Sequence, residues 1–161
     1  MKTPPPQDIR SISSISSISV LAAGPAEDRA VLTEILVQSQ WPLCPNTRWR
    51  LKTATSLASA LFALRKQRVP IVLCDCELGA GAWVEMLEQL STLAAPPFLI
   101  VTSRTADEYL WAEALNLGAY DVLAKPFHAE EVVRVLSLAW LQWERQRGSP
   151  GYRAKPAGAD N

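Results

Sequence analysis

The sequence has few of the residues that bind metal ions or form disulfide frameworks. Its 161 residues include one histidine, His128, and three cysteines, Cys44, Cys74 and Cys76. The cysteines form a C-x-C pair and no C-x-x-C pair, so the spacing of neither a zinc site nor a redox pair is present. An odd number of cysteines also argues against a disulfide framework. We therefore predict that the cysteines are reduced and that the protein is cytoplasmic.

Long apolar runs and an excess of charge of either sign are also absent. No run approaches the ~18 apolar residues that cross a bilayer, and serines interrupt the apolar residues near the N-terminus, unlike in a signal peptide. The 16 Lys and Arg residues balance the 16 Asp and Glu residues, so the whole chain has no attraction for nucleic acids or anionic membranes. We interpret the basic residues between Arg48 and Arg68 as solvated faces of a strand and a helix. The expected partners therefore include neither nucleic acid nor membrane.

The composition predicts one globular domain between two low-complexity ends. Hydrophobic residues make up 48% of the chain, and the length suits a single stable core. Residues 1–16 contain three consecutive prolines and repeated Ser-Ile-Ser triplets, which predicts a disordered leader. Residues 147–161 lack periodicity and are predicted to form a disordered tail. The domain itself is predicted to span residues 17–146.

Between these ends, short apolar runs alternate with segments of helical periodicity. The runs predict strands, and apolar residues repeating every three or four positions predict amphipathic helices. Thr105 and Glu108 fit a capping box at the start of the fourth helix, and Gly118 fits its C-terminal end. The fifth helix is expected to end at Glu144. The expected strands are residues 18–23, 49–53, 69–74, 98–101 and 122–123, and the expected helices begin near Pro25, Leu57, Trp83, Thr105 and Ala129.

This order of elements predicts an α/β fold, in which helices cover both faces of a parallel sheet. We expect a flavodoxin-like, doubly wound (βα)5 sheet with the strand order 2-1-3-4-5. In such a sheet the functional site lies at the carboxyl ends of the strands, where the strand order reverses. Three strand ends carry polar residues there: Asp75 after the third strand, Thr102 and Ser103 after the fourth, and Lys125 after the fifth.

The residues around the last strand resemble a family signature. Residues 117–127 read LGAYDVLAKPF, which is similar to the Gly-Ala…Lys-Pro-Phe signature of the receiver domains of two-component response regulators. The spacings of 28 residues from Asp75 to Ser103 and of 22 residues from Ser103 to Lys125 are also similar to those of the family. The resemblance covers most of the chain, from about residue 17 to residue 145.

The resemblance implies a site for phosphoryl transfer. Asp75 would accept a phosphoryl group, Lys125 would contact the phosphoryl oxygens, and Ser103 would be the hydroxyl that moves to bond the phosphate, with Thr102 as the second choice. The family uses Mg²⁺ together with the lysine to neutralise charge during the transfer. An ion pair between Lys125 and Asp75 is also expected before phosphorylation. We do not expect an enzyme, beyond autophosphorylation and autodephosphorylation at Asp75.

The metal site departs from the family pattern at the end of the first strand. Receiver domains carry an acidic pair there, whereas this sequence has Ala22 and Ala23. Mg²⁺ usually binds one or two carboxylates together with waters and substrate phosphate. Asp75 and Glu77 are the remaining candidate ligands, and we expect weak or absent Mg²⁺ binding.

Three other residues bear on this site. Glu27 and Asp28 could reach it from the first helix, but we favour the interpretation that they interact with the positive end of the helix dipole. Val122 lies three positions before Lys125, where the family often has an aromatic residue that is coupled to the switch hydroxyl. This difference predicts a weaker link between phosphorylation and conformational change.

Two functions are open at this point. The first is a stand-alone receiver domain in phosphorelay signal transduction, with Asp75 as phosphoacceptor and a histidine kinase or phosphotransfer protein as partner. The alternative is a pseudo-receiver, which would be a phosphorylation-independent protein–protein interaction module. Leu138, Leu141 and Trp111 are predicted to lie on outer faces of the last two helices. They indicate a homodimer or a docked partner on the fourth and fifth helices, or a C-terminal tail folded over this face.

Overall fold

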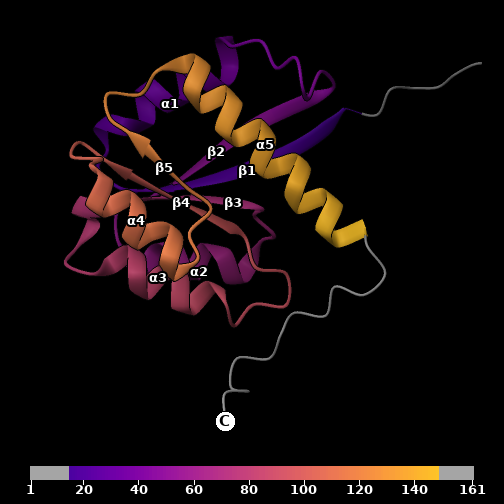
Figure 1. Ribbon diagram of the computed structural model, residues 1–161. Helices are drawn as coiled ribbons and strands as arrows, with labels where there is room; N and C mark the ends of the chain where they lie inside the picture. The colour runs from indigo at the N-terminus through magenta and orange to yellow at the C-terminus, as the bar shows by residue number, and fades with distance from the viewer. Residues whose placement is uncertain (1–14, 149–161) are drawn as a thin grey trace, which may run out of the picture.

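The computed structural model describes residues 15–148. Within them, five parallel strands form one sheet in the order β2-β1-β3-β4-β5, which confirms the predicted topology. Figure 1 shows α1 and α5 on one side of the sheet and α2, α3 and α4 on the other. The strands are β1 (Ser16–Ala23), β2 (Thr47–Ala54), β3 (Ile71–Asp75), β4 (Phe98–Ser103) and β5 (Asp121–Ala124). The helices are α1 (Glu27–Gln38), α2 (Leu57–Lys66), α3 (Ala82–Leu90), α4 (Glu108–Leu117) and α5 (Ala129–Gly148), and a 3-10 turn, η1 (Cys76–Leu78), follows β3 directly.

The predicted leader (1–16) and tail (147–161) lie almost wholly outside the described residues. At their inner ends, β1 already begins at Ser16 and α5 continues to Gly148, past the end predicted at Glu144. The described residues therefore cover the predicted range 17–146 and two further residues at either end. Within residues 15–148, no helix is both long enough and apolar enough to cross a membrane.

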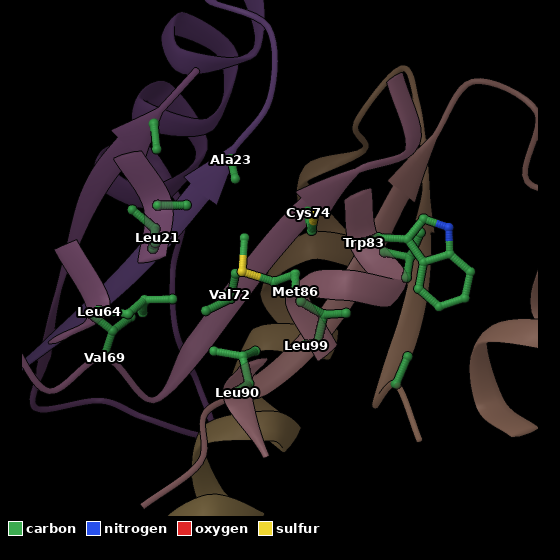
Figure 2. Close-up of a cluster of buried hydrophobic side chains, with 14 of the residues drawn as sticks. Leu21, Ala23, Leu64, Val69, Val72, Cys74, Trp83, Met86, Leu90 and Leu99 are labelled. Carbon is green, nitrogen blue, oxygen red and sulfur yellow. The ribbon is translucent and has the colours of Figure 1, made fainter. Parts of the chain in front are cut away.

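Alternate residues of each strand face opposite sides of the sheet and build two cores. On β1, Leu21 and Ala23 pack with α2 and α3, whereas Ile18 and Val20 pack with α1 and α5. Successive side chains of a strand point to opposite faces, so the central strands must be apolar at every position to supply both cores. Figure 2 shows the first core, in which Met86 of α3 lies over the strands. The continuous apolar runs of the sequence are thus explained by burial on both faces.

The start of α4 differs from the prediction. Its N-cap is Asp107, whose carboxylate accepts a hydrogen bond from the backbone N of Leu110 at 2.9 Å. The predicted capping box of Thr105 and Glu108 is therefore wrong. The physical reason is that Asp107 has the extended backbone an N-cap needs, while the backbone N of Thr105 donates to Ser103 Oγ instead.

The other helix ends are close to those expected. Helix α1 begins at Glu27 rather than at Pro25, and its first turn contains the acidic residues Glu27 and Asp28. Gly118 follows α4 with a φ angle of 104°, in the left-handed conformation that glycine adopts without strain. It confirms the predicted end of that helix and turns the chain into β5.

Candidate functional site

Side chains from three strand ends meet at the carboxyl edge of the sheet. Asp75 is the last residue of β3, Thr102 and Ser103 end β4, and Lys125 follows β5. The parallel pairing of β3 with β4 places Asp75 beside Thr102. The sheet register thus brings the carboxylate of Asp75, the hydroxyl of Thr102 and the ammonium of Lys125 together.

The Asp75 carboxylate is buried and bonded through both of its oxygens. Its side chain is 1% exposed. Oδ1 accepts a hydrogen bond from the backbone N of Glu77 at 2.7 Å, within the η1 turn. Oδ2 accepts one from Thr102 Oγ1 at 3.0 Å and forms an ion pair with Lys125 Nζ. A buried carboxylate is costly unless it is paired and hydrogen-bonded, so these three contacts replace the water that Asp75 loses on burial.

Lys125 bridges two carboxylates. Besides its ion pair with Asp75, which confirms the predicted pair, its Nζ lies 3.0 Å from Oδ2 of Asp28 in the first turn of α1. Burial of Lys125 tends to lower the pKa of its amine, but the hydrogen bonds to Asp75 and Asp28 outweigh burial and raise this pKa above its ordinary value. Lys125 is therefore a full ammonium ion at neutral pH.

Asp28 is the residue for which the sequence interpretation was wrong. That interpretation left both acidic residues of the first turn to the helix dipole, but the Asp28 carboxylate reaches across to Lys125. Glu27, its neighbour, is exposed. The turn from β1 into α1 is short enough to hold Asp28 at the sheet edge, and periodicity alone does not show which of two neighbouring acids points there.

The side chains of two predicted site residues, Ser103 and Glu77, form no hydrogen bond with the Asp75 carboxylate in the described structure. Ser103 is buried, and its Oγ accepts a hydrogen bond from the backbone N of Thr105 at 3.1 Å. The hydroxyl bonded to Asp75 is that of Thr102, which the spacing ranked second. Glu77 contributes its backbone N to Asp75, and its side chain is exposed. The role of Ser103 as the hydroxyl that moves on phosphorylation stays a prediction.

Small residues occupy the end of β1 and the position that follows it. Ala22 and Ala23 line a mostly apolar cavity of about 110 Å³. Gly24 approaches so closely that a Cβ added to it would lie 2.9 Å from Cβ of Asp75. Any larger residue at position 24 would force the backbone at this position or the side chain of Asp75 to shift. The end of β1 thus carries no carboxylate at the two positions where the resemblance implied an acidic pair.

The fold and site together define the class of the protein. It is a flavodoxin-like α/β domain whose carboxyl edge, at the point where strand order reverses, carries an acid, a hydroxyl and a lysine on neighbouring strand ends. The family model of the response regulator receiver domain matches residues 26–137. The chain therefore belongs to the response regulator receiver domain family, as its sequence predicted.

Curated relatives support this membership over part of their own length. The transcriptional regulatory protein TcrX of Mycobacterium tuberculosis is 36% identical over 86 residues, which are 53% of this chain and 36% of TcrX. The regulatory protein VirG of Agrobacterium fabrum is 32% identical over 76 residues, which are 47% of this chain and 30% of VirG. The chain spans less than half the length of the curated relatives it matches.

Solved structures show the same fold. The receiver domain of a LuxO repressor protein from Vibrio parahaemolyticus matches with a TM-score of 0.69 and 15% identity, over 84% of this chain and 99% of that domain. The receiver domain of a sensor histidine kinase from Pseudomonas aeruginosa matches with a TM-score of 0.59 and 19% identity, over 76% of this chain and 97% of that domain. The latter holds a magnesium ion in its active-site cleft. At these identities the likeness establishes the fold alone.

Receiver domains in general bind Mg²⁺ at this edge, but the residues present here do not fit the ion well. Mg²⁺ requires near-octahedral oxygen ligands, usually from carboxylates, waters and phosphate. Asp75 and Asp28, the two carboxylates bonded at this edge, are both held by the Lys125 ammonium. Within residues 15–148, no group of three or more His, Cys, Asp or Glu side chains is arranged to hold a metal.

The two hydroxyls at the end of β4 can be told apart by their effects on stability. We expect Thr102→Val to lower the free energy of unfolding by about 1–3 kcal/mol, because a buried charged acceptor loses its hydroxyl donor. Ser103→Ala is the matched control, with an expected loss of about 0.5–1.5 kcal/mol, because it removes a neutral hydrogen bond. Urea unfolding at neutral pH measures both. A larger loss for Ser103→Ala than for Thr102→Val would contradict the assignment of Thr102 as the partner of Asp75.

Proposed function

We propose that this receiver domain accepts a phosphoryl group at Asp75 in a phosphorelay. One observation carries the proposal: the Asp75 carboxylate is held against the Lys125 ammonium at the carboxyl edge of the sheet. A carboxylate becomes a phosphoacceptor when fixed positive charge and hydrogen-bond donors stand where the negative charge of the phosphoryl oxygens develops. Lys125 and the hydroxyl of Thr102 are placed for this role.

A phosphohistidine or a small acyl phosphate can serve as the phosphoryl donor without any further reactant. One Asp75 oxygen attacks phosphorus in line, and the new O–P bond forms as the bond from phosphorus to the donor nitrogen or oxygen breaks. The leaving group keeps the electron pair, and an imidazole leaving group takes up a proton. Lys125 and Thr102 stabilise charge on the transferring oxygens. Asp75 therefore acts as the nucleophile, while Lys125 and Thr102 orient the phosphoryl group and neutralise charge on its oxygens.

Access to Asp75 requires local rearrangement. The Asp75 side chain is 1% exposed and that of Lys125 is 5% exposed, so a donor reaches the carboxylate only after the surrounding side chains separate. The contacts of Asp75 with Thr102 and Lys125 are the ones that must open or lengthen. Phosphorylation is therefore coupled to movement at the ends of β4 and β5.

A histidine kinase or a phosphotransfer protein is the expected donor, and the cytoplasm is the expected compartment. A homodimer through α4 and α5 also stays a prediction. Trp111 on α4 and Leu138 on α5 are 38% and 42% exposed, which supports it. Leu141 is half-buried and packs against the core beneath α5, so it contributes less to an outer surface than its sequence position suggested.

The proposal is tested by removing the acceptor oxygen. We expect wild-type protein incubated with acetyl phosphate, or with a phosphorylated histidine kinase, to gain the mass of one phosphoryl group in intact-protein mass spectrometry. Asp75→Asn should not gain it, because the amide is not a nucleophile at neutral pH. Asp121→Asn, a half-buried acid at the start of β5, should label as the wild type does.

The labelling is measured both with Mg²⁺ and with EDTA, and a phosphoryl group at Asp75 in either buffer supports the proposal. Equal labelling of wild type and Asp75→Asn would contradict it. Absence of labelling of the wild type in both buffers and with both donors would also contradict the proposal. The remaining function would then be the phosphorylation-independent interaction module.

A further inference from the structure

The cation that neutralises charge at this site is part of the chain itself. Nζ of Lys125 contacts Asp75 on one side and lies 3.0 Å from Asp28 Oδ2 on the other. The side chains of Asp28, Asp75 and Lys125 are 17%, 1% and 5% exposed. Because water is largely excluded, the attraction between these charges is only weakly screened. The ammonium therefore lies between two largely buried carboxylates.

Both carboxylate oxygens of Asp75 are already bonded within the chain. Oδ1 of Asp75 accepts from the backbone N of Glu77, and Oδ2 accepts from Thr102 and Lys125. Ala22 and Ala23 provide no ligand oxygen from their side chains. A divalent ion would have to displace Lys125 from both acids, or bind beside it against charge repulsion.

We infer that Asp28 and Lys125 replace the divalent metal at this site, so that Asp75 accepts a phosphoryl group without Mg²⁺. This inference rests on the proposed function. Asp28 is the positioning residue: it does not touch the donor, but it holds the ammonium over the sheet edge when Asp75 becomes an acyl phosphate and leaves its present contacts. Without Asp28, Lys125 would have one buried anion to hold it instead of two.

The charge balance supports this role. Asp28 and Asp75 together with Lys125 carry one negative charge in excess. When an Asp75 oxygen bonds to phosphorus, the carboxylate loses its charge and the phosphoryl group brings its own. Lys125 can then contact phosphoryl oxygens while keeping its bond to Asp28, so a cation is present at each stage of the transfer. The step needs only the phosphodonor, and no metal ion is gained or released.

The first test compares labelling with and without Mg²⁺. Wild-type protein is treated with acetyl phosphate in EDTA and in millimolar Mg²⁺, and the initial rate of phosphoryl incorporation at Asp75 is measured by mass spectrometry. We expect the two rates to agree within about twofold, since the barrier does not depend on the metal. Labelling that requires Mg²⁺ would overturn the inference and leave the proposed function intact. No labelling in either buffer would refute both.

The second test addresses Asp28 itself. In EDTA, Asp28→Asn should slow labelling by about tenfold or more, as expected when a charge contact to the neutralising cation is lost. Asp28→Glu should recover most of the rate, because a carboxylate is again available to Lys125. Glu27→Gln, at the exposed neighbouring position, is the matched control and should label at the wild-type rate. Unchanged labelling of Asp28→Asn, or failure of Asp28→Glu to recover any of the loss, would overturn the positioning role.

A binding measurement that does not depend on phosphorylation completes the test. Amide NMR spectra of the wild type are recorded during titration with Mg²⁺ alone. We expect no saturable shifts at Asp75, Glu77 or Lys125 up to millimolar concentrations. Saturable shifts at these residues would show that the ion displaces Lys125, and they would overturn the inference even if the labelling rates were equal.

Discussion

Replacement of Lys125 by methionine is expected to lower the free energy of unfolding by about 3–5 kcal/mol, the usual cost of leaving one member of a buried ion pair unpaired. Asp75 would keep its hydrogen bonds from Thr102 and from the backbone N of Glu77. It would lose the only cation bonded to it in the described structure, residues 15–148. The same variant should also fail to be phosphorylated, because no fixed positive charge faces the phosphoryl oxygens.

Urea unfolding at neutral pH measures the stability effect, and a second variant identifies its cause. Adding Asp75→Asn to Lys125→Met should restore part of the lost stability, because the unpaired buried charge is then removed. Lys66→Met is the control at an exposed position, where Nζ lies over the Phe62 ring at 4.3 Å. It should cost less than about 1 kcal/mol. If Asp75→Asn lowered the stability of the Lys125→Met protein further, the loss would not come from an unpaired carboxylate.

The second large effect concerns the core beneath α5. Leu136 is 0% exposed and packs in the core between the sheet and helices α1 and α5. We expect Leu136→Ala to lower the free energy of unfolding by about 2–5 kcal/mol, through lost burial and the cavity left in a packed interior. Leu138→Ala removes the same atoms from the same helix at a position that is 42% exposed.

The two leucine variants form a matched pair, since helix propensity changes equally in both. Thermal or urea unfolding should show that Leu138→Ala costs at least about 2 kcal/mol less than Leu136→Ala, because less apolar surface is lost from a packed environment. A comparable loss at both positions would mean that Leu138 is also buried in solution. In that case it would be covered by another copy of the chain or by another segment of it, as the predicted homodimer through α4 and α5 requires.

Much of the fold could be predicted because burial on two faces leaves a strong pattern in a sequence. β3 is buried at every position and β1 is apolar from Val20 to Ala23, because both strands supply side chains to the two cores, while the buried residues of each helix recur with helical spacing. The alternation of strands and helices predicts a parallel sheet, and the order 2-1-3-4-5 follows from the flavodoxin-like fold. Asp75 and Lys125 could be predicted as neighbours because both lie at the carboxyl ends of parallel strands.

The remaining features depend on side-chain direction, which periodicity does not encode. The spacing favoured Ser103 as the hydroxyl that bonds the phosphate, which stays a prediction, and it did not show that Thr102 is the residue bonded to Asp75 in this structure. Asp28 reaches Lys125 across 97 positions of sequence, and no local pattern distinguishes it from Glu27. Asp107 rather than Thr105 caps α4 because the final residues of the loop adopt the extended backbone. In each case the deciding quantity was a local dihedral angle or a long-range contact.

The bond between Asp28 and Lys125 also bears on when the protein becomes competent to signal. It joins the first helix to the loop after the last strand, and contacts between residues so distant in sequence form only after much chain entropy has been lost. A chain still being synthesised has Asp75 and Asp28 long before it has Lys125. The ion pair of Asp75 with Lys125 is thus completed only when β5 has joined the sheet. On the proposed function, an unfinished or partly unfolded chain would therefore lack the cation that phosphoryl transfer to Asp75 needs.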